Sequence, residues 1–245
     1  MKTRSLTFQT VQATCLAAAI ALAGAPALAQ AQRPADAAVV QANTGTPNAS
    51  DLLFEQPQMK NVAPGTTLTY DYIRRSGIEK GPFGPPLNDR IKLNVDAAAQ
   101  PENRNIRVEM FSGANRFPAG PFEDMPGNPV MTLFLEHHLG SVAKVLMANP
   151  RYIKNGIRKA LRENATVTPV QATFKGKTVE AWRIEVQPFV DDKMKDRMRG
   201  LSNLTYVFVT SAAVPGELLS IEARSKNAEG GELLEEQLSY DQNAG

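Results

Sequence analysis

Alternation of apolar and polar residues with a period of two is the feature that most constrains how this chain folds. In the first part of the chain, three segments show it, with the apolar positions Leu68, Tyr70 and Tyr72, then Ile91, Leu93 and Val95, then Ile106, Val108 and Met110. About five later segments repeat it, at residues 170–174, 182–186, 204–208, 219–223 and 234–240. Such alternation is typical of strands with one buried side and one solvent-facing side.

The middle of the chain has a helical pattern instead. Asn128-Pro129 and Asn149-Pro150 each pair an N-cap residue with a proline suited to the first helical position. Behind each pair, apolar residues recur at helical spacing, from Met131 to Leu146 in the first case and from Ile153 to Leu161 in the second. We therefore expect two consecutive helices, over about 129–148 and 150–163, with a bend at the second Asn-Pro pair.

Strands, then two helices, then more strands is the element order of an α+β fold rather than of repeated βαβ units. We expect about eight strands in a strongly curved antiparallel sheet, a half-barrel. The helical pair is expected to pack on its concave face and to leave an apolar cavity there. The residues expected to line that cavity as ligand contacts are Tyr70, Tyr72, Phe134, Trp182 and Phe208.

The N-terminus has the order of a secretory signal peptide. Lys2 and Arg4 precede a short apolar run at residues 16–24, and Ala27-x-Ala29 supplies the small residues that signal peptidase requires. We expect cleavage after Ala29, or after Ala31, and export to the periplasm. The apolar run is shorter than the roughly 20 residues of a membrane span, so no transmembrane segment is expected after processing.

Removal of residues 1–29 also changes the composition. The full chain has 27 basic and 25 acidic residues, and the signal contains two of the basic ones and no acid. Its loss leaves a net charge near zero, which argues against a nucleic-acid partner. The only cysteine, Cys15, is removed as well. Residues 30–64, rich in Pro, Ala and Gln, are predicted to be a flexible linker, and residues 65–245 a single α+β domain.

The same element order, together with a C-terminal hairpin that carries residues 214–223, resembles the periplasmic carriers of outer-membrane lipoproteins, the Lol-type fold. The resemblance covers roughly residues 66–240 and rests on element order, so it transfers no functional residue. It implies a half-barrel under a helical lid that holds acyl chains.

The patterns that suggest catalysis are short. Ser141-x-x-Lys144 matches the Ser-x-x-Lys of penicillin-interactive enzymes, but the Lys-Thr-Gly and Ser-x-Asn elements of those enzymes are not matched. His137 and His138, the two histidines, are neighbours on a helix and point about 100° apart, which does not suit a shared metal. One is expected to face the sheet and the other solvent. We assign no catalytic residue, metal ligand or cofactor.

Two surfaces remain as candidates for binding. The second helix carries a basic face of Arg151, Lys154, Arg158 and Arg162, which suits an anionic membrane surface or an acidic partner. Two proline-rich loops carry Phe83, Phe117 and Phe122, which are candidates for a ligand-mouth rim or a partner surface.

The sequence is compatible with three functions. The first is a non-enzymatic exported protein that binds or carries a lipid, an acyl chain or another apolar ligand. The alternative is an envelope protein-interaction module without a ligand. A hydrolase or metalloenzyme that uses Ser141, Lys144 or the histidines is the third.

Overall fold

The computed structural model describes residues 45–77, 83–227 and 230–244. The predicted signal peptide and residues 30–44 of the predicted linker lie outside the described residues, so export and cleavage remain predictions. The described strands are β1 (Thr67–Ser76), β2 (Leu87–Ala97), β3 (Arg104–Met110), β4 (Phe122–Met125), β5 (Thr166–Phe174), β6 (Lys177–Val186), β7 (Thr205–Thr210), β8 (Leu218–Lys226) and β9 (Glu232–Tyr240).

These nine strands form one antiparallel sheet with the order β4-β3-β2-β1-β9-β8-β7-β6-β5. The first and last strands, β1 and β9, pair at its centre, and two meanders run outward from them. The α+β class is confirmed. The additional strand is β4, a short edge strand inside the second proline-rich loop. Its four residues have no buried position, and therefore no alternation marks it in the sequence.

The prediction of a strongly curved half-barrel is wrong: the sheet is not strongly curled. Curling a sheet needs bulges or glycine kinks in its strands. The central pairs β1–β2, β1–β9 and β2–β3 keep an uninterrupted register, and none of the nine described strands contains a glycine. Register shifts occur only in the pairs β3–β4, β7–β8 and β8–β9.

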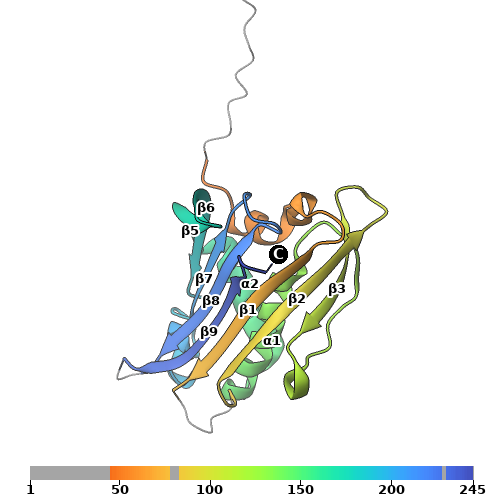
Figure 1. Ribbon diagram of the computed structural model, residues 1–245. Coiled ribbons are helices and arrows are strands. Elements are labelled where there is room, and N and C mark those ends of the chain that lie inside the picture. The colour runs from red at the N-terminus through yellow and green to blue at the C-terminus, as the bar shows by residue number, and fades with distance from the viewer. Residues whose placement is uncertain (1–44, 78–82, 228–229, 245) are drawn as a thin grey trace, which may run out of the picture. The chain divides into compact units, whose positions relative to one another are not determined.

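Two helices, α1 (Pro129–Leu146) and α2 (Pro150–Glu163), lie on one face of the sheet (Figure 1). Both begin where the Asn-Pro pairs predict. The side chain of Asn128 accepts a hydrogen bond from the Val130 amide at 3.1 Å, and Asn149 accepts one from the Arg151 amide at 2.9 Å. Met147 ends α1 in a left-handed conformation, and the short connection returns the chain as α2. None of the described helices is long and apolar enough to cross a bilayer.

The two caps differ in burial, which gives a matched pair for mutation. Asn128 is buried. Its side-chain nitrogen Nδ2 also donates hydrogen bonds to the Tyr70 hydroxyl and to the Gly216 carbonyl, both at 2.9 Å. Asn149 is exposed. We expect Asn128→Ala to lower the free energy of unfolding by about 2–4 kcal/mol, because it removes a cap and leaves buried polar groups without a partner. Asn149→Ala is expected to cost about 1 kcal/mol. Urea denaturation of both variants tests this, and equal losses would contradict it.

The chain before β1 is part of the compact unit, which spans Gly45–Gly245. It forms two short helical turns, η1 (Asp51–Glu55) and η2 (Gln58–Asn61), within the last part of the predicted linker. Leu53, Met59 and Val62 are buried there. The buried Arg104 of β3 fixes this segment, because its Nε donates to the Val62 carbonyl at 2.6 Å.

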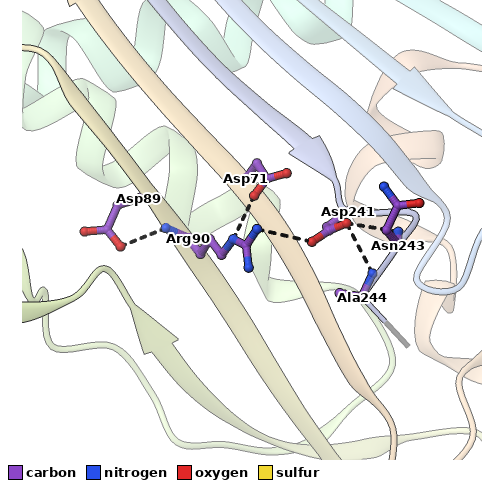
Figure 2. Close-up of polar contacts among 6 residues, drawn as sticks. All are labelled: Asp71, Asp89, Arg90, Asp241, Asn243 and Ala244. Atoms are coloured by element: carbon purple, nitrogen blue, oxygen red, sulfur yellow. Dashed lines mark hydrogen bonds and ion pairs between the residues drawn. The ribbon is translucent and has the colours of Figure 1, made fainter.

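The face of the sheet opposite the helices is polar. Figure 2 shows Arg90 of β2 between two carboxylates: its Nε lies 2.9 Å from Asp71 of β1, and its guanidinium lies 3.6 Å from Asp241. Asp241 also accepts hydrogen bonds from the amides of Asn243 and Ala244. This network places residues 241–244 against β1 and β2. Its exposed members make it a weak contributor to stability.

Candidate functional site

The interior between the sheet and α1 is filled with large side chains. Tyr70, Tyr72, Phe134 and Phe208 are at most 1% exposed, and Trp182 is half-buried. Phe134 packs edge-to-face against Tyr72, and Tyr70 packs in the same way against Tyr240. The structure thus places four of the five expected ligand contacts in the packed core. Their role as ligand contacts stays a prediction.

A carboxylate lies within this core. Glu236 of β9 has no exposed side-chain surface, and the Tyr72 hydroxyl donates a hydrogen bond of 2.9 Å to its Oε2. His138 of α1, also fully buried, places Nδ1 3.3 Å from Oε1 of Glu236 without the alignment of a hydrogen bond. The ring of His138 stacks on Phe134 and meets Tyr206 edge-on. Glu236, Tyr72, His138 and Tyr206 are called the polar core cluster below.

Burial and charge act in opposite directions on the ionisable groups here. Burial alone would raise the pKa of Glu236, but its electrostatic interactions with His138 and His137 and the Tyr72 hydrogen bond bring that pKa below its ordinary value. Burial, and then the nearby Glu236 carboxylate, raise the pKa of Tyr72 and of Tyr206. Burial lowers the pKa of His137. The cluster therefore holds an ionised carboxylate beside neutral phenols in the core.

Sequence reasoning missed Glu236, although a signal was present. In β9 the inward positions are Leu234, Glu236, Leu238 and Tyr240, so a carboxylate occupies the apolar side of an alternating strand. The cluster is enclosed by the sheet and α1, and its four members have no exposure that would admit a substrate.

A pocket of about 370 Å³ lies elsewhere, between α1, α2 and η1. No residue of a strand lines it. Its apolar lining consists of Phe54, Leu135, Leu139, Ile157 and Leu161. Leu135 and Leu139 are separated by one turn of α1, and Ile157 and Leu161 by one turn of α2, so each helix presents one apolar stripe to the pocket. Phe54 of η1, which also lines the pocket, is 42% exposed.

Charged side chains surround this apolar lining. Lys154, Arg158 and Arg162 of α2 line the pocket, so it contains three of the four residues of the predicted basic face. Arg151, the fourth, does not line it. Two carboxylates, Glu136 of α1 and Glu55 of η1, are also present. Glu136 forms an ion pair with Lys154.

Hydrogen bonds hold the wall of the pocket that η1 supplies. Gln58 is 1% exposed, and its side-chain nitrogen donates to the Leu52 carbonyl at 3.0 Å. The oxygen of the same side chain accepts a hydrogen bond of 3.0 Å from the Asn128 amide, at the start of α1. One buried side chain therefore links η1 to the N-terminus of α1. Leu52 and Leu53 of η1 are both buried.

The two proline-rich loops differ from each other. Phe83 is buried at 2% exposure, Phe122 is half-buried in β4, and Phe117 is 42% exposed. Phe117 packs edge-to-face against His137, whose ring also contacts Tyr72. Phe83, one of the candidates for a rim or partner surface, is buried instead, because its apolar ring packs into the core. A rim or partner role for these loops stays a prediction.

The remaining chemistry candidates differ in burial. In α1, Ser141 is half-buried and Lys144 is exposed. His138 faces the sheet as expected of one histidine, whereas His137 is half-buried among aromatic rings instead of solvent-facing. Within the described residues, no group of three or more His, Cys, Asp or Glu side chains is arranged to hold a metal ion.

Comparison with known proteins assigns no function to this chain. No family model matches the chain, and no curated protein matches it. Among solved structures, the crystal structure of the lipoprotein LppX from Mycobacterium tuberculosis is similar over 76% of this chain and 90% of that chain, with 8% sequence identity and a TM-score of 0.31. A likeness this distant supports no inference about ligand or activity, and the Lol-type resemblance remains an expectation.

Proposed function

We propose that this chain is a non-enzymatic, exported binding or carrier protein for an apolar ligand such as a lipid or an acyl chain. The observation that supports the proposal is the pocket between α1, α2 and η1. At about 370 Å³ it falls within the range of roughly 300–1,000 Å³ typical of small-molecule sites. Its apolar stripes come from two helices, and apolar surface of this kind is typical of such sites. Five of its twelve lining residues are charged.

The groups that converge on the pocket favour binding over catalysis. Its hydroxyls, Ser50 and Thr132, come from different elements, and the pocket lining places no histidine beside either of them. Glu136, the carboxylate one turn from Thr132 on α1, is engaged in an ion pair with Lys154. Nucleophilic catalysis needs a base within hydrogen-bond reach of the nucleophile. The histidines instead lie at the sheet side of α1, in or beside the core.

A pocket-filling substitution tests the proposal. Leu135 is half-buried and lines the pocket, so a tryptophan at this position has room to extend into it. We expect the wild-type protein to bind an environment-sensitive fluorescent fatty acid saturably, with one site per chain. Leu135→Trp should weaken that binding at least tenfold, because the larger ring occupies the volume that the acyl chain needs. Fluorescence titration measures both affinities.

Leu133→Trp is the matched control. Leu133 is also a half-buried leucine of α1, but it does not line the pocket. This variant should bind the probe as the wild type does if it keeps the wild-type circular dichroism spectrum. Absence of saturable binding by the wild-type protein, or equal losses in the two variants, would contradict a ligand in this pocket.

The alternative, an envelope protein-interaction module, is favoured by a different observation. Met147, at the end of α1, is 85% exposed, and Tyr152, Val190 and Met194 are each more than 40% exposed. The Tyr152 hydroxyl donates to Asp192 at 2.6 Å, which brings the loop with Val190 and Met194 to the start of α2. An exposed apolar group of this kind suits a partner surface. Full function in cells of the Leu135→Trp variant would support this alternative.

A further inference from the structure

The charges around the pocket define the ligand more closely than its apolar lining does. Arg158 and Arg162 lie one turn apart on α2, and both line the pocket. Lys154 is engaged by Glu136, but the ion pairs found among the described residues leave both arginines without an acidic partner. Arginine presents a planar fork of donors that matches a carboxylate or phosphate group. Two such forks beside an apolar lining suit a ligand that has both an anionic end and an apolar end.

The volume and lining of the pocket limit the size of the ligand's apolar part. About 370 Å³ lies near the lower limit for a small-molecule site. The two stripes, Leu135 with Leu139 and Ile157 with Leu161, run along the facing sides of two helices. A pocket of this volume accommodates one extended chain, whereas a lipid with several acyl chains needs more volume.

We infer that the pocket binds a single-chain amphiphile whose carboxylate or phosphate headgroup is held by Arg158 and Arg162. The inference rests on the proposed function and specifies its ligand class. The chain of the amphiphile lies between the leucine and isoleucine stripes, and the headgroup lies at the rim of α2. Glu55, on the opposite wall, opposes the headgroup by like-charge repulsion.

The experiment compares three probes by isothermal titration calorimetry on the processed chain, below the critical micelle concentration. Dodecanoate has the chain and an anionic head, monolauroylglycerol has the same acyl chain with a neutral head, and inorganic phosphate has the charge alone. Dodecanoate is expected to bind at one site, at least tenfold more tightly than monolauroylglycerol, and phosphate is expected to give no saturable binding. Equal affinity for the two amphiphiles would overturn the headgroup assignment and leave the proposed function intact. Absence of binding by both would overturn both proposals, and saturation by phosphate alone would show a simple anion site instead.

Substitutions then test which residues bind the headgroup. Arg158→Gln and Arg162→Gln should each weaken dodecanoate binding about tenfold, as expected for loss of a charged hydrogen bond, and should leave monolauroylglycerol binding unchanged. Arg151→Gln makes the same chemical change on the same helix outside the pocket, and it should leave both affinities unchanged. Glu55→Gln should tighten dodecanoate binding severalfold, because it removes the opposing charge. A loss in Arg151→Gln equal to that in the pocket variants would overturn the assignment, since the effect would then be the general charge of α2.

Discussion

Glu236→Ala is expected to lower the free energy of unfolding by about 3–5 kcal/mol, the typical cost of breaking a buried ionic contact by removing one partner. The Tyr72 hydroxyl loses its acceptor, and His138 loses the carboxylate 3.3 Å from its ring. Both groups remain buried without water to replace that partner. Chemical denaturation at neutral pH, followed by circular dichroism, measures the change.

Glu235→Ala is the matched control on the same strand. Glu235 faces the other side of β9 and forms only a 3.7 Å ion pair with the exposed Arg75. Its removal should cost less than about 1 kcal/mol. Replacing Glu236 and His138 together by leucine should cost less than the sum of the two single changes, because neither polar group then remains buried alone. Equal costs for Glu236→Ala and Glu235→Ala would show that the polar core cluster does not stabilise the fold.

The pH dependence of stability provides a second readout. The pKa of Glu236 is lower in the folded chain than its ordinary value of 4.5, so its carboxylate stabilises the fold above about pH 4.5. That contribution is lost as the pH falls through the folded pKa. The pKa of His137 is also lower in the folded chain, so the fold favours the neutral ring. Stability therefore also falls as the pH drops below about 6.5, where the unfolded chain binds this proton more readily. Stability should therefore fall on acidification, and the part below pH 4.5 should be smaller in Glu236→Ala.

Phe134→Ala should lower the free energy of unfolding by about 3–5 kcal/mol. Phe134 is 1% exposed and packs against Tyr72 of β1 and, within α1, against His138. Close-packed neighbours of this kind cannot collapse fully into the space left by the ring. Leu135→Ala should cost less than about 2 kcal/mol, because Leu135 borders the pocket and is already partly exposed.

Urea denaturation of these two variants and of Val190→Ala tests this ordering. Val190 is 46% exposed, and its truncation should change stability by no more than about 0.5 kcal/mol. A Phe134→Ala variant as stable as Val190→Ala would mean that α1 does not carry the core of the domain.

The helical pair was predictable because its signals are local. Asn128-Pro129 and Asn149-Pro150 act within one turn of chain, through a side-chain cap and a fixed proline backbone angle. The observed helices therefore start at the predicted prolines. The buried faces of β1 and β2 followed from alternation for the same reason, since successive side chains of a strand point to opposite faces.

The candidate site was only partly predictable. The basic face of α2 was visible as helical spacing, and three of its four residues line the pocket. The pocket itself could not be predicted, because it depends on how η1 meets α1 and α2, and those contacts join residues about 80 to 110 positions apart. The hydrogen bond from the Asn128 amide to Gln58, which links η1 to α1, also joins distant residues, and no local pattern predicts it.

The sequence by itself determined the elements of this protein: the α+β class, the two capped helices and the inward faces of most strands. Only the tertiary structure decided the open sheet, the polar core cluster and the location of the pocket outside the sheet–helix interior. The physical reason is the range of the forces. Capping and alternation act between residues a few positions apart, whereas sheet curvature, the pairing of Glu236 with Tyr72 and His138, and the space left between packed helices depend on contacts between residues distant in the chain.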